Sequence, residues 1–218
     1  MARRSFGKPV ERSFDAKDWN PKTALGRKIK SGEITSLEEI LSTGARILEP
    51  EVVDALLPDL REEVLEVTST QRMTAYGRKM QMRAVVVVGD SKGFVGAGVG
   101  KAADTRDAIA EALKSAKKNI IHVRLGNGSW EETGAGESHS LEREAVGRSS
   151  STKIVIKPAP RGVGIVANKT SKSVLKLAGV KDAWTFTNGR TRNILNMVLA
   201  TMNALDTLNR LKMGSSRS

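Results

Sequence analysis

Residues Arg83–Asn119 read RAVVVVGDSKGFVGAGVGKAADTRDAIAEALKSAKKN, and this stretch decides the fold. Ala84–Gly89 is a run of apolar β-forming residues that ends in glycine, which predicts a buried strand. Asp90–Gly93 supplies turn residues, and Phe94–Lys101 predicts a second strand that returns along the first. Beyond Asp104 the apolar residues recur at helical spacing. The stretch therefore predicts a strand hairpin followed by an amphipathic helix.

The helix predicted over residues 104–119 has an apolar face and a basic face. The apolar face carries Ile109, Ala112, Leu113 and Ala116, and the basic face carries Lys114, Lys117 and Lys118. A hairpin crossed by such a helix offers a surface suited to a polyanion. The rest of the sequence has to indicate whether this surface binds a nucleotide, a nucleic acid or no ligand.

Three glycines of the second strand, Gly96, Gly98 and Gly100, share one strand face because alternate residues point the same way. Bare glycine on a strand indicates close approach of another backbone or a helix, and close approach of RNA is the alternative. A nucleotide site is not supported. A phosphate-binding loop needs glycine where Val95 stands and Ser or Thr where Ala102 stands, and the glycine spacing does not match the dinucleotide fingerprint.

The composition points to an anionic partner. The 218-residue chain carries 36 Lys+Arg and 24 Asp+Glu, which gives a net charge of +12 and a pI near 10.1. Neutralisation of phosphate is the usual reason for such an imbalance, so a nucleic acid is expected. The chain has no cysteine, which excludes disulfides and thiolate chemistry. No secretory signal or run of about 18 apolar residues occurs, so no membrane partner is expected.

The charge is distributed in blocks. Residues 1–32 carry nine Lys/Arg against three Asp/Glu, whereas residues 33–66 carry two against ten. Residues 67–128 carry eleven against four, and residues 129–218 carry fourteen against seven. The pattern indicates an acidic segment that faces protein or solvent, set between basic segments that can face phosphate.

The first segments divide into an arm and an acidic extension. Residues 1–32 form a basic, aperiodic N-terminal arm, either a disordered tail or an arm that orders on RNA. Its aromatic side chains, which would stack on bases, are Phe6, Phe14 and Trp19. Residues 33–62 form an acidic helical extension with two short helices. Thr35 or Ser36 is expected to cap the first, and the second is expected over Pro50–Leu57.

Residues 63–124 are expected to form the next domain. Glu63–Thr70 alternates as a first strand, and Arg72–Gln81 is expected to be a hairpin loop with Tyr76-Gly77 as its turn. Three cations and one aromatic ring in this loop favour contact with RNA. Three antiparallel strands followed by a helix indicate a double-stranded-RNA-binding-like βββα domain.

The rest of the chain is expected to form a second domain. Residues 125–138 form a Gly-rich linker, residues 139–211 a C-terminal α/β domain and residues 212–218 a tail. Strands are expected over His139–Val146 and Thr152–Lys157, followed by a stiff cationic loop, Pro158–Gly164. Thr170 is expected to cap a helix through Leu177, and the final helix is expected over Arg192–Leu211.

No catalytic constellation is present in the sequence. The two histidines, His122 and His139, are too few and too far apart for a metal site or a triad. We therefore expect no enzyme activity, no cofactor, no metal and no small-molecule substrate. A free RNA-processing factor and a nucleotide-dependent enzyme remain the alternatives to a structural RNA-binding protein.

Six motifs in order resemble the family of small-subunit ribosomal protein five, in its archaeal form. They are AVVVVGD (84–90), GFVGAGVGKA (93–102), AKKNIIHV (116–123), KPAPRGVGIVA (157–167), VLKLAGVKD (174–182) and NMVLATMNAL (196–205). The resemblance covers about residues 64–208. It implies an α+β fold, a double-stranded-RNA-binding-like βββα domain followed by a second α/β domain with a left-handed βαβ crossover.

The resemblance also implies a function. It implies a structural constituent of the small ribosomal subunit, cytoplasmic and ribosome-bound, that binds small-subunit rRNA. It further implies contact with the neighbouring ribosomal protein four and support of translational accuracy near the mRNA path. The residues expected to bind RNA are Arg72, Tyr76, Gly77, Arg78, Lys79, Lys101 and Arg161. Those expected at the protein interface are Asn168, Lys169 and Lys172.

Overall fold

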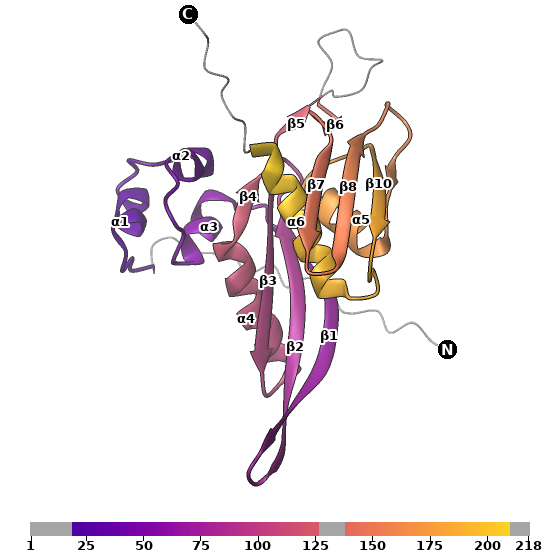
Figure 1. The fold of residues 1–218 in the computed structure, drawn as a ribbon. Coiled ribbons are helices and arrows are strands. Elements are labelled where there is room, and N and C mark those ends of the chain that lie inside the picture. Colours follow the sequence, from indigo (N-terminus) through magenta and orange to yellow (C-terminus); the bar gives the residue numbers. More distant parts are fainter. Residues whose placement is uncertain (1–18, 127–137, 210–218) are drawn as a thin grey trace, which may run out of the picture.

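The structure, a computed structural model, describes residues 19–126 and 138–209. Residues 1–18 of the arm, with Phe6 and Phe14, residues 127–137 of the linker and the tail lie outside the described residues. Two sheets lie side by side with helices packed against them, and a long hairpin extends below them (Figure 1). The expected α+β architecture with two parts is confirmed.

The first sheet is antiparallel, and its strand order is β1-β2-β3-β4. Its elements are β1 (Arg61–Thr74), β2 (Gly77–Gly89), β3 (Phe94–Ala102), β4 (Ile120–His122) and the helix α4 (Thr105–Lys118). The order β1-β2-β3-α4 confirms the expected βββα arrangement. The short strand β4 was not expected, and it pairs with the first residues of β3.

The glycines of β3 let α4 lie directly on the sheet. A Cβ atom on Gly96, Gly98 or Gly100 would come closer than 3.0 Å to backbone atoms of α4. The helix turns its small residues Ala112 and Ala116, both fully buried, toward this face. Close backbone approach is therefore the role of these glycines, as predicted.

The second sheet has the strand order β7-β8-β10-β9. Its elements are β7 (Ala145–Ser149), β8 (Thr152–Pro158), β9 (Ile165–Val166), α5 (Lys169–Leu177), β10 (Ala183–Asn188) and α6 (Ile194–Asn209). β9 and β10 are parallel neighbours joined through α5, so the expected βαβ crossover is present. The left-handedness of this crossover stays a prediction. Between the two sheets in sequence, β5 (Leu125–Gly126) pairs with β6 (Ser140–Leu141).

One hydrophobic core is shared by the two sheets. Val85, Val87 and Val95 of the first sheet belong to the same buried cluster as Ile154 of β8 and Leu205 of α6. The final helix contributes an apolar stripe to this cluster, with Val198, Met202, Leu205 and Leu208 buried and Leu195 partly buried. The two sheets are therefore held together by packing as well as by the chain that connects them.

The acidic extension forms a second cluster against the first sheet. Its helices are α2 (Leu37–Ser42) and α3 (Glu51–Leu56), and its buried residues pack with Val88 of β2 and Ala116 of α4. The helix α1 (Ala24–Lys30), at the end of the arm, packs against the same cluster. Ser36 precedes α2 as predicted, although its side chain makes no capping hydrogen bond. The acidic segment thus faces protein, as expected.

The end of the N-terminal arm differs from the prediction. Residues 24–30 form α1, capped by Thr23, whose Oγ1 accepts a hydrogen bond from the Gly26 N–H. Trp19 packs against the second cluster instead of being displayed for stacking on bases. The helix was missed because its apolar contacts, Leu25 and Ile29, are too few to give a periodic pattern.

Three boundaries in the sequence analysis were wrong. Thr170 does not cap α5; Asn168 precedes the helix, and Thr170 lies buried inside its first turn. The strand expected over His139–Val146 is two strands, because β6 pairs with β5 while β7 pairs with β8. The loop expected over Arg72–Gln81 is mostly strand, because the backbone hydrogen bonds of β1 and β2 continue almost to the turn.

Candidate nucleic-acid interface

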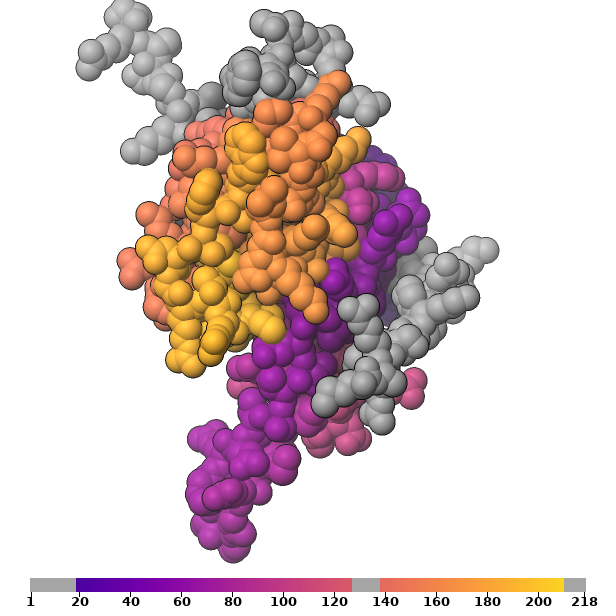
Figure 2. Space-filling view, turned by 90° about the vertical axis from the view of Figure 1, so that its right-hand side faces the viewer, coloured from indigo at the N-terminus to yellow at the C-terminus, as the bar shows by residue number. Residues whose placement is uncertain are grey.

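The β1–β2 hairpin carries most of the predicted RNA-binding residues. It projects from the body of the molecule as a narrow spike (Figure 2). The register pairs Arg72 with Lys79 and Met73 with Arg78, and every residue from Gln71 to Met80 is exposed. The hairpin is long because cross-strand hydrogen bonds satisfy its backbone even where neither face is covered.

The turn of the hairpin displays an aromatic ring. Thr74 pairs with Gly77 across a two-residue connection, Ala75-Tyr76, and the Thr74 hydroxyl donates to the Gly77 carbonyl over 2.8 Å. Gly77 has a φ of +126°, which favours glycine at this position. The Tyr76 side chain is completely exposed. It contributes no packing to the fold and is free to stack on a ligand.

One face of the first sheet forms a line of cations. Residues paired across antiparallel strands share a face, and so do alternate residues along one strand. By this rule Arg72, Lys79, Arg83 and Lys101 lie on the same face, since Arg83 pairs with Lys101. We call these four residues the cationic face. Arg83 was not predicted as a site residue, because it directly precedes the apolar run of β2.

Arg78 lies on the opposite face of the hairpin. Its neighbours there are Met73 and Met80, whose exposed fractions are 70% and 57%. Nearer the body the same face carries Met82 and Ala84, which pack toward α4. The predicted cluster of three cations is therefore split, with Arg72 and Lys79 on one side and Arg78 on the other.

An acidic residue lies at the root of the cationic face. Glu66 Oε2 is 3.7 Å from an Arg83 guanidinium nitrogen, and both side chains are about one-quarter exposed. Lys101, at the edge of the face, is exposed, and its backbone N–H donates to Glu111 Oε2 over 3.0 Å. Within the part of the chain that the structure describes, Arg72 and Lys79, toward the hairpin tip, are thus the two cations of this face with no carboxylate contact.

Arg161 lies far from the hairpin, so the predicted RNA-binding residues do not form one surface. It is exposed on the loop between β8 and β9, at the end of the second sheet next to β6. In Figure 1 the label of β6 is at the top of the molecule and the hairpin tip is at the bottom. The chain therefore presents two separate basic sites.

The predicted protein-interface residues lie together at the start of α5. Asn168, Lys169 and Lys172 are all exposed, and the Lys172 N–H donates to the Asn168 carbonyl over 2.8 Å. Lys176, which the prediction did not include, extends the row by one turn. This row lies on the helix side of the second sheet, apart from the cationic face.

Comparison with known proteins identifies the family. The model of the ribosomal protein S5 N-terminal domain matches residues 60–124, and that of the S5 C-terminal domain matches residues 147–216. The chain belongs to the ribosomal protein S5 family. The two matched ranges correspond to the first sheet with α4 and to most of the second sheet with α5 and α6. The helices α1, α2 and α3 lie outside both S5 domain matches.

Archaeal members of the S5 family match nearly the whole chain. The small ribosomal subunit protein uS5 of Methanocaldococcus jannaschii is 52% identical over 90% of this chain and 90% of its own length. The uS5 proteins of Methanospirillum hungatei and Methanoregula boonei are 48% and 46% identical, over 93% and 94% of this chain and 98% and 99% of theirs. The expected archaeal form is therefore confirmed.

S5 proteins are structural components of the ribosome and not enzymes, as the sequence analysis expected. In the described part of this S5 chain, no three His, Asp or Glu side chains are grouped so that they could hold a metal ion. Within the same residues, no helix has the length and apolar character needed to cross a membrane.

Proposed function

We propose that this chain is a structural constituent of the small ribosomal subunit in the cytoplasm and that it binds small-subunit rRNA through the hairpin. Membership in the S5 family and the names of its relatives support the assignment to the small subunit. The observation that carries the proposal on this chain is the cross-strand pair of Arg72 and Lys79 on an exposed, projecting hairpin.

The proposed mechanism is neutralisation of phosphate combined with recognition of backbone shape. Arg72 and Lys79 point to the same side and can meet adjacent phosphates of one strand, while Arg78 meets RNA on the other side. Gly77 lets the tip adopt a turn with no Cβ in the way, and Tyr76 stacks on an unpaired base. The hairpin thus enters an RNA groove or junction with contacts on both faces.

Lys101 and Arg161 add phosphate contacts away from the tip. Lys101 continues the cationic face on β3, so RNA that follows the hairpin toward the body meets it next. Arg161 contacts a different part of the rRNA, since it lies at the far end of the second sheet. Two separated contacts fix the orientation of the protein on the RNA better than one does.

The row at the start of α5 is proposed as the docking surface for the neighbouring small-subunit ribosomal protein four. Asn168, Lys169 and Lys172 are exposed on one helical turn, and their charge suits an acidic patch on a partner. Through this contact, and through the hairpin near the mRNA path, the chain would support translational accuracy. The basis for these finer assignments is the family resemblance.

The salt dependence of binding tests the RNA part of the proposal. The Arg72→Gln, Lys79→Gln double variant should bind archaeal small-subunit rRNA more weakly. Its slope of log K against log[salt] should be shallower by the amount expected for the loss of about two phosphate contacts. Lys114→Gln is the matched control, because it removes one charge from the exposed side of α4, away from the cationic face. Equal slopes for the double variant and the wild type would contradict the proposal.

Assembly tests the assignment to the subunit. The protein should co-sediment with small subunits in stoichiometric amount and remain bound in moderate salt. Release under those conditions, with retained affinity for duplex RNA, would instead support a free RNA-processing factor.

A further inference from the structure

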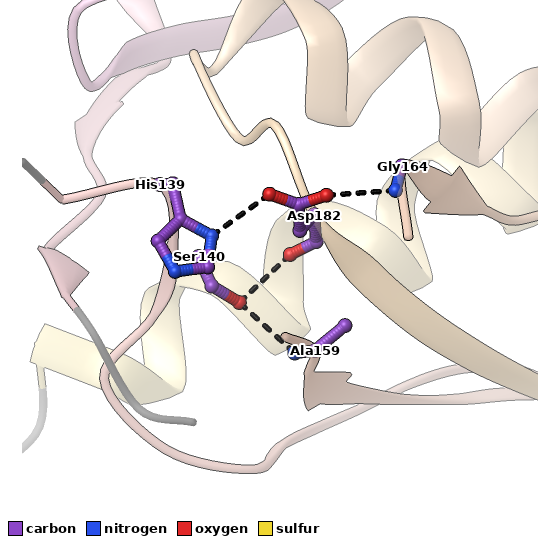
Figure 3. A network of polar contacts seen from close by, with 5 residues as sticks. All are labelled: His139, Ser140, Ala159, Gly164 and Asp182. Atoms are coloured by element: carbon purple, nitrogen blue, oxygen red, sulfur yellow. Dashed lines mark hydrogen bonds and ion pairs between the residues drawn. The ribbon is translucent and has the colours of Figure 1, made fainter. Parts of the chain in front are cut away.

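A buried polar cluster lies where the linker re-enters the second sheet. It consists of His139, Ser140 and Asp182, whose exposed fractions are 4%, 0% and 6% (Figure 3). His139 Nδ1 is 2.8 Å from Asp182 Oδ2, and the Ser140 hydroxyl donates to the Asp182 carbonyl over 2.7 Å. The serine does not bond the histidine, so the cluster is not a catalytic triad.

The cluster holds both ends of the loop that carries Arg161. At the first end, the Ala159 N–H donates to Ser140 Oγ over 3.2 Å. At the second end, the Gly164 N–H donates to Asp182 Oδ1 over 2.7 Å, and the Gly164 carbonyl accepts from the Ala183 N–H over 3.2 Å. The residues between these ends, with Arg161 among them, lie at the surface.

The backbone geometry of the loop and of the residue before it limits the loop further. Pro158 and Pro160 restrict the chain before Arg161, since the ring of proline fixes φ. Gly162 and Gly164 have φ angles of +86° and +72°, a conformation that other residues rarely adopt. A segment this short, held at both ends, has few conformations available.

Stability alone does not account for such a cluster. A buried pair of hydrogen-bonded polar side chains typically adds little net stability compared with apolar residues of the same size, because the polar groups lose their hydration. The hydrogen bonds of buried polar groups instead specify one local geometry. Here the geometry specified is that of the loop, because the backbone amides that the cluster binds are those of Ala159 and Gly164.

We propose that His139, Ser140 and Asp182 act as a clamp that positions Arg161 for an RNA phosphate. Ordering the loop before binding lowers the entropy that binding must otherwise remove. These three residues are positioning residues, because none of them is exposed enough to touch RNA. The inference rests on the proposed function, since it takes RNA to be the ligand of Arg161.

The test is competition between variant and labelled wild-type full-length protein for incorporation into small subunits assembled from archaeal rRNA and the other subunit proteins. Ser140→Ala should lower incorporation about three- to tenfold, as expected from hydrogen bonds lost at one end of the loop. Arg161→Ala should have a similar effect. The Ser140→Ala, Arg161→Ala double variant should be incorporated as well as Arg161→Ala alone. Ser140 acts through the position of Arg161, so its removal has no further effect once the arginine is absent.

Control variants separate positioning from general destabilisation. Ser171→Ala removes another fully buried hydroxyl, which lies 3.2 Å from Thr201 Oγ1 between α5 and α6 and does not contact the loop. It should be incorporated like the wild type. Asp182→Asn keeps an acceptor for the Gly164 N–H and should be incorporated better than Asp182→Ala. Amide hydrogen exchange in the free protein should be faster at Ala159 in Ser140→Ala and unchanged there in Ser171→Ala.

Three results would overturn the clamp. The first is equal incorporation of Ser140→Ala and Ser171→Ala. The second is a double variant whose defect equals the product of the two single defects, since independent effects would exclude positioning of Arg161 by Ser140. The third is wild-type incorporation of Arg161→Ala. In the third case, the Arg72→Gln, Lys79→Gln double variant separates the two proposals. If this variant binds rRNA normally, the proposed function is contradicted as well. If it binds rRNA weakly, the proposed function is supported and only the clamp is excluded.

Discussion

A Cβ atom placed on Gly98 of β3 would overlap the backbone nitrogen of Ala116 in α4. The helix therefore rests on the strand backbone itself, and no side chain of β3 separates the two at this point. Gly96 and Gly100 make the same kind of contact along the helix. This close packing positions β2 and β3 against α4, and the β1–β2 hairpin continues outward beyond the end of α4 (Figure 1).

Gly98→Ala should destabilise the protein by about 3 kcal/mol, because the added methyl group can be accommodated only if the backbone of α4 shifts. Urea unfolding followed by circular dichroism measures the change. Gly32→Ala is the control. No atom lies within 4 Å of a Cβ at that position, so only its φ of +80° opposes the substitution, at a cost of about 1 kcal/mol. Equal losses of unfolding free energy in the two variants would show that α4 can move away from β3 at little energetic cost.

Gly89→Ala should weaken the attachment of the second sheet to the first. A Cβ at this position would lie 2.9 Å from the Leu177 Cβ and closer still to its carbonyl group. We expect a loss of about 2 kcal/mol in unfolding free energy. Ser173→Ala removes an exposed hydrogen bond of 2.8 Å to Glu63 across the same boundary and should cost less than about 0.5 kcal/mol. The opposite ranking would mean that polar contacts, and not packing, join the two sheets.

Asp54→Asn should loosen the acidic extension. Asp54 Oδ1 lies 2.6 Å from Lys117 Nζ of α4, and the two side chains are only 25% and 17% exposed. We expect a loss of about 1 kcal/mol and faster proteolysis within the extension. The comparison is Asp59→Asn, whose partner Lys92 is 3.6 Å away at an exposed site and whose loss should be below about 0.5 kcal/mol. Similar proteolysis rates in both variants would contradict a structural role for the inner pair.

Tyr76→Ser should reduce binding to rRNA without changing stability. The ring is completely exposed, so its removal takes no contact from the folded protein. Loss of stacking on one base should cost about 1–3 kcal/mol of binding free energy, measured by filter binding. Tyr76→Phe keeps the ring and should bind like the wild type. If the serine variant also binds normally, Tyr76 does not stack on RNA.

Much of the first domain is predictable from local pattern. The apolar run of β2, the turn at Asp90–Gly93 and the helical spacing beyond Asp104 each depend on neighbours in sequence, and all three were confirmed. The alternating glycines predicted a close contact for the same reason, since the absence of a side chain is visible in the sequence. The family was also recognisable from motifs in order.

The candidate site was only partly predictable. Tyr76 and its neighbouring cations were found because they are an unusual group between two strands. The sequence placed them in a loop, since residues that are exposed on both strand faces show no apolar alternation. It therefore missed that Arg78 points away from Arg72 and that Arg83 joins the cationic face, because faces follow from the register.

What the sequence determined by itself is the set of local elements, the basic character and the family, because these depend on residues close together in the chain or on composition. Only the tertiary structure decided which distant residues meet. It brought His139 to Asp182, placed Trp19 against the acidic extension and merged the two sheets into one core. Such contacts depend on how whole elements pack, and their energy is shared among many residues that no local pattern connects.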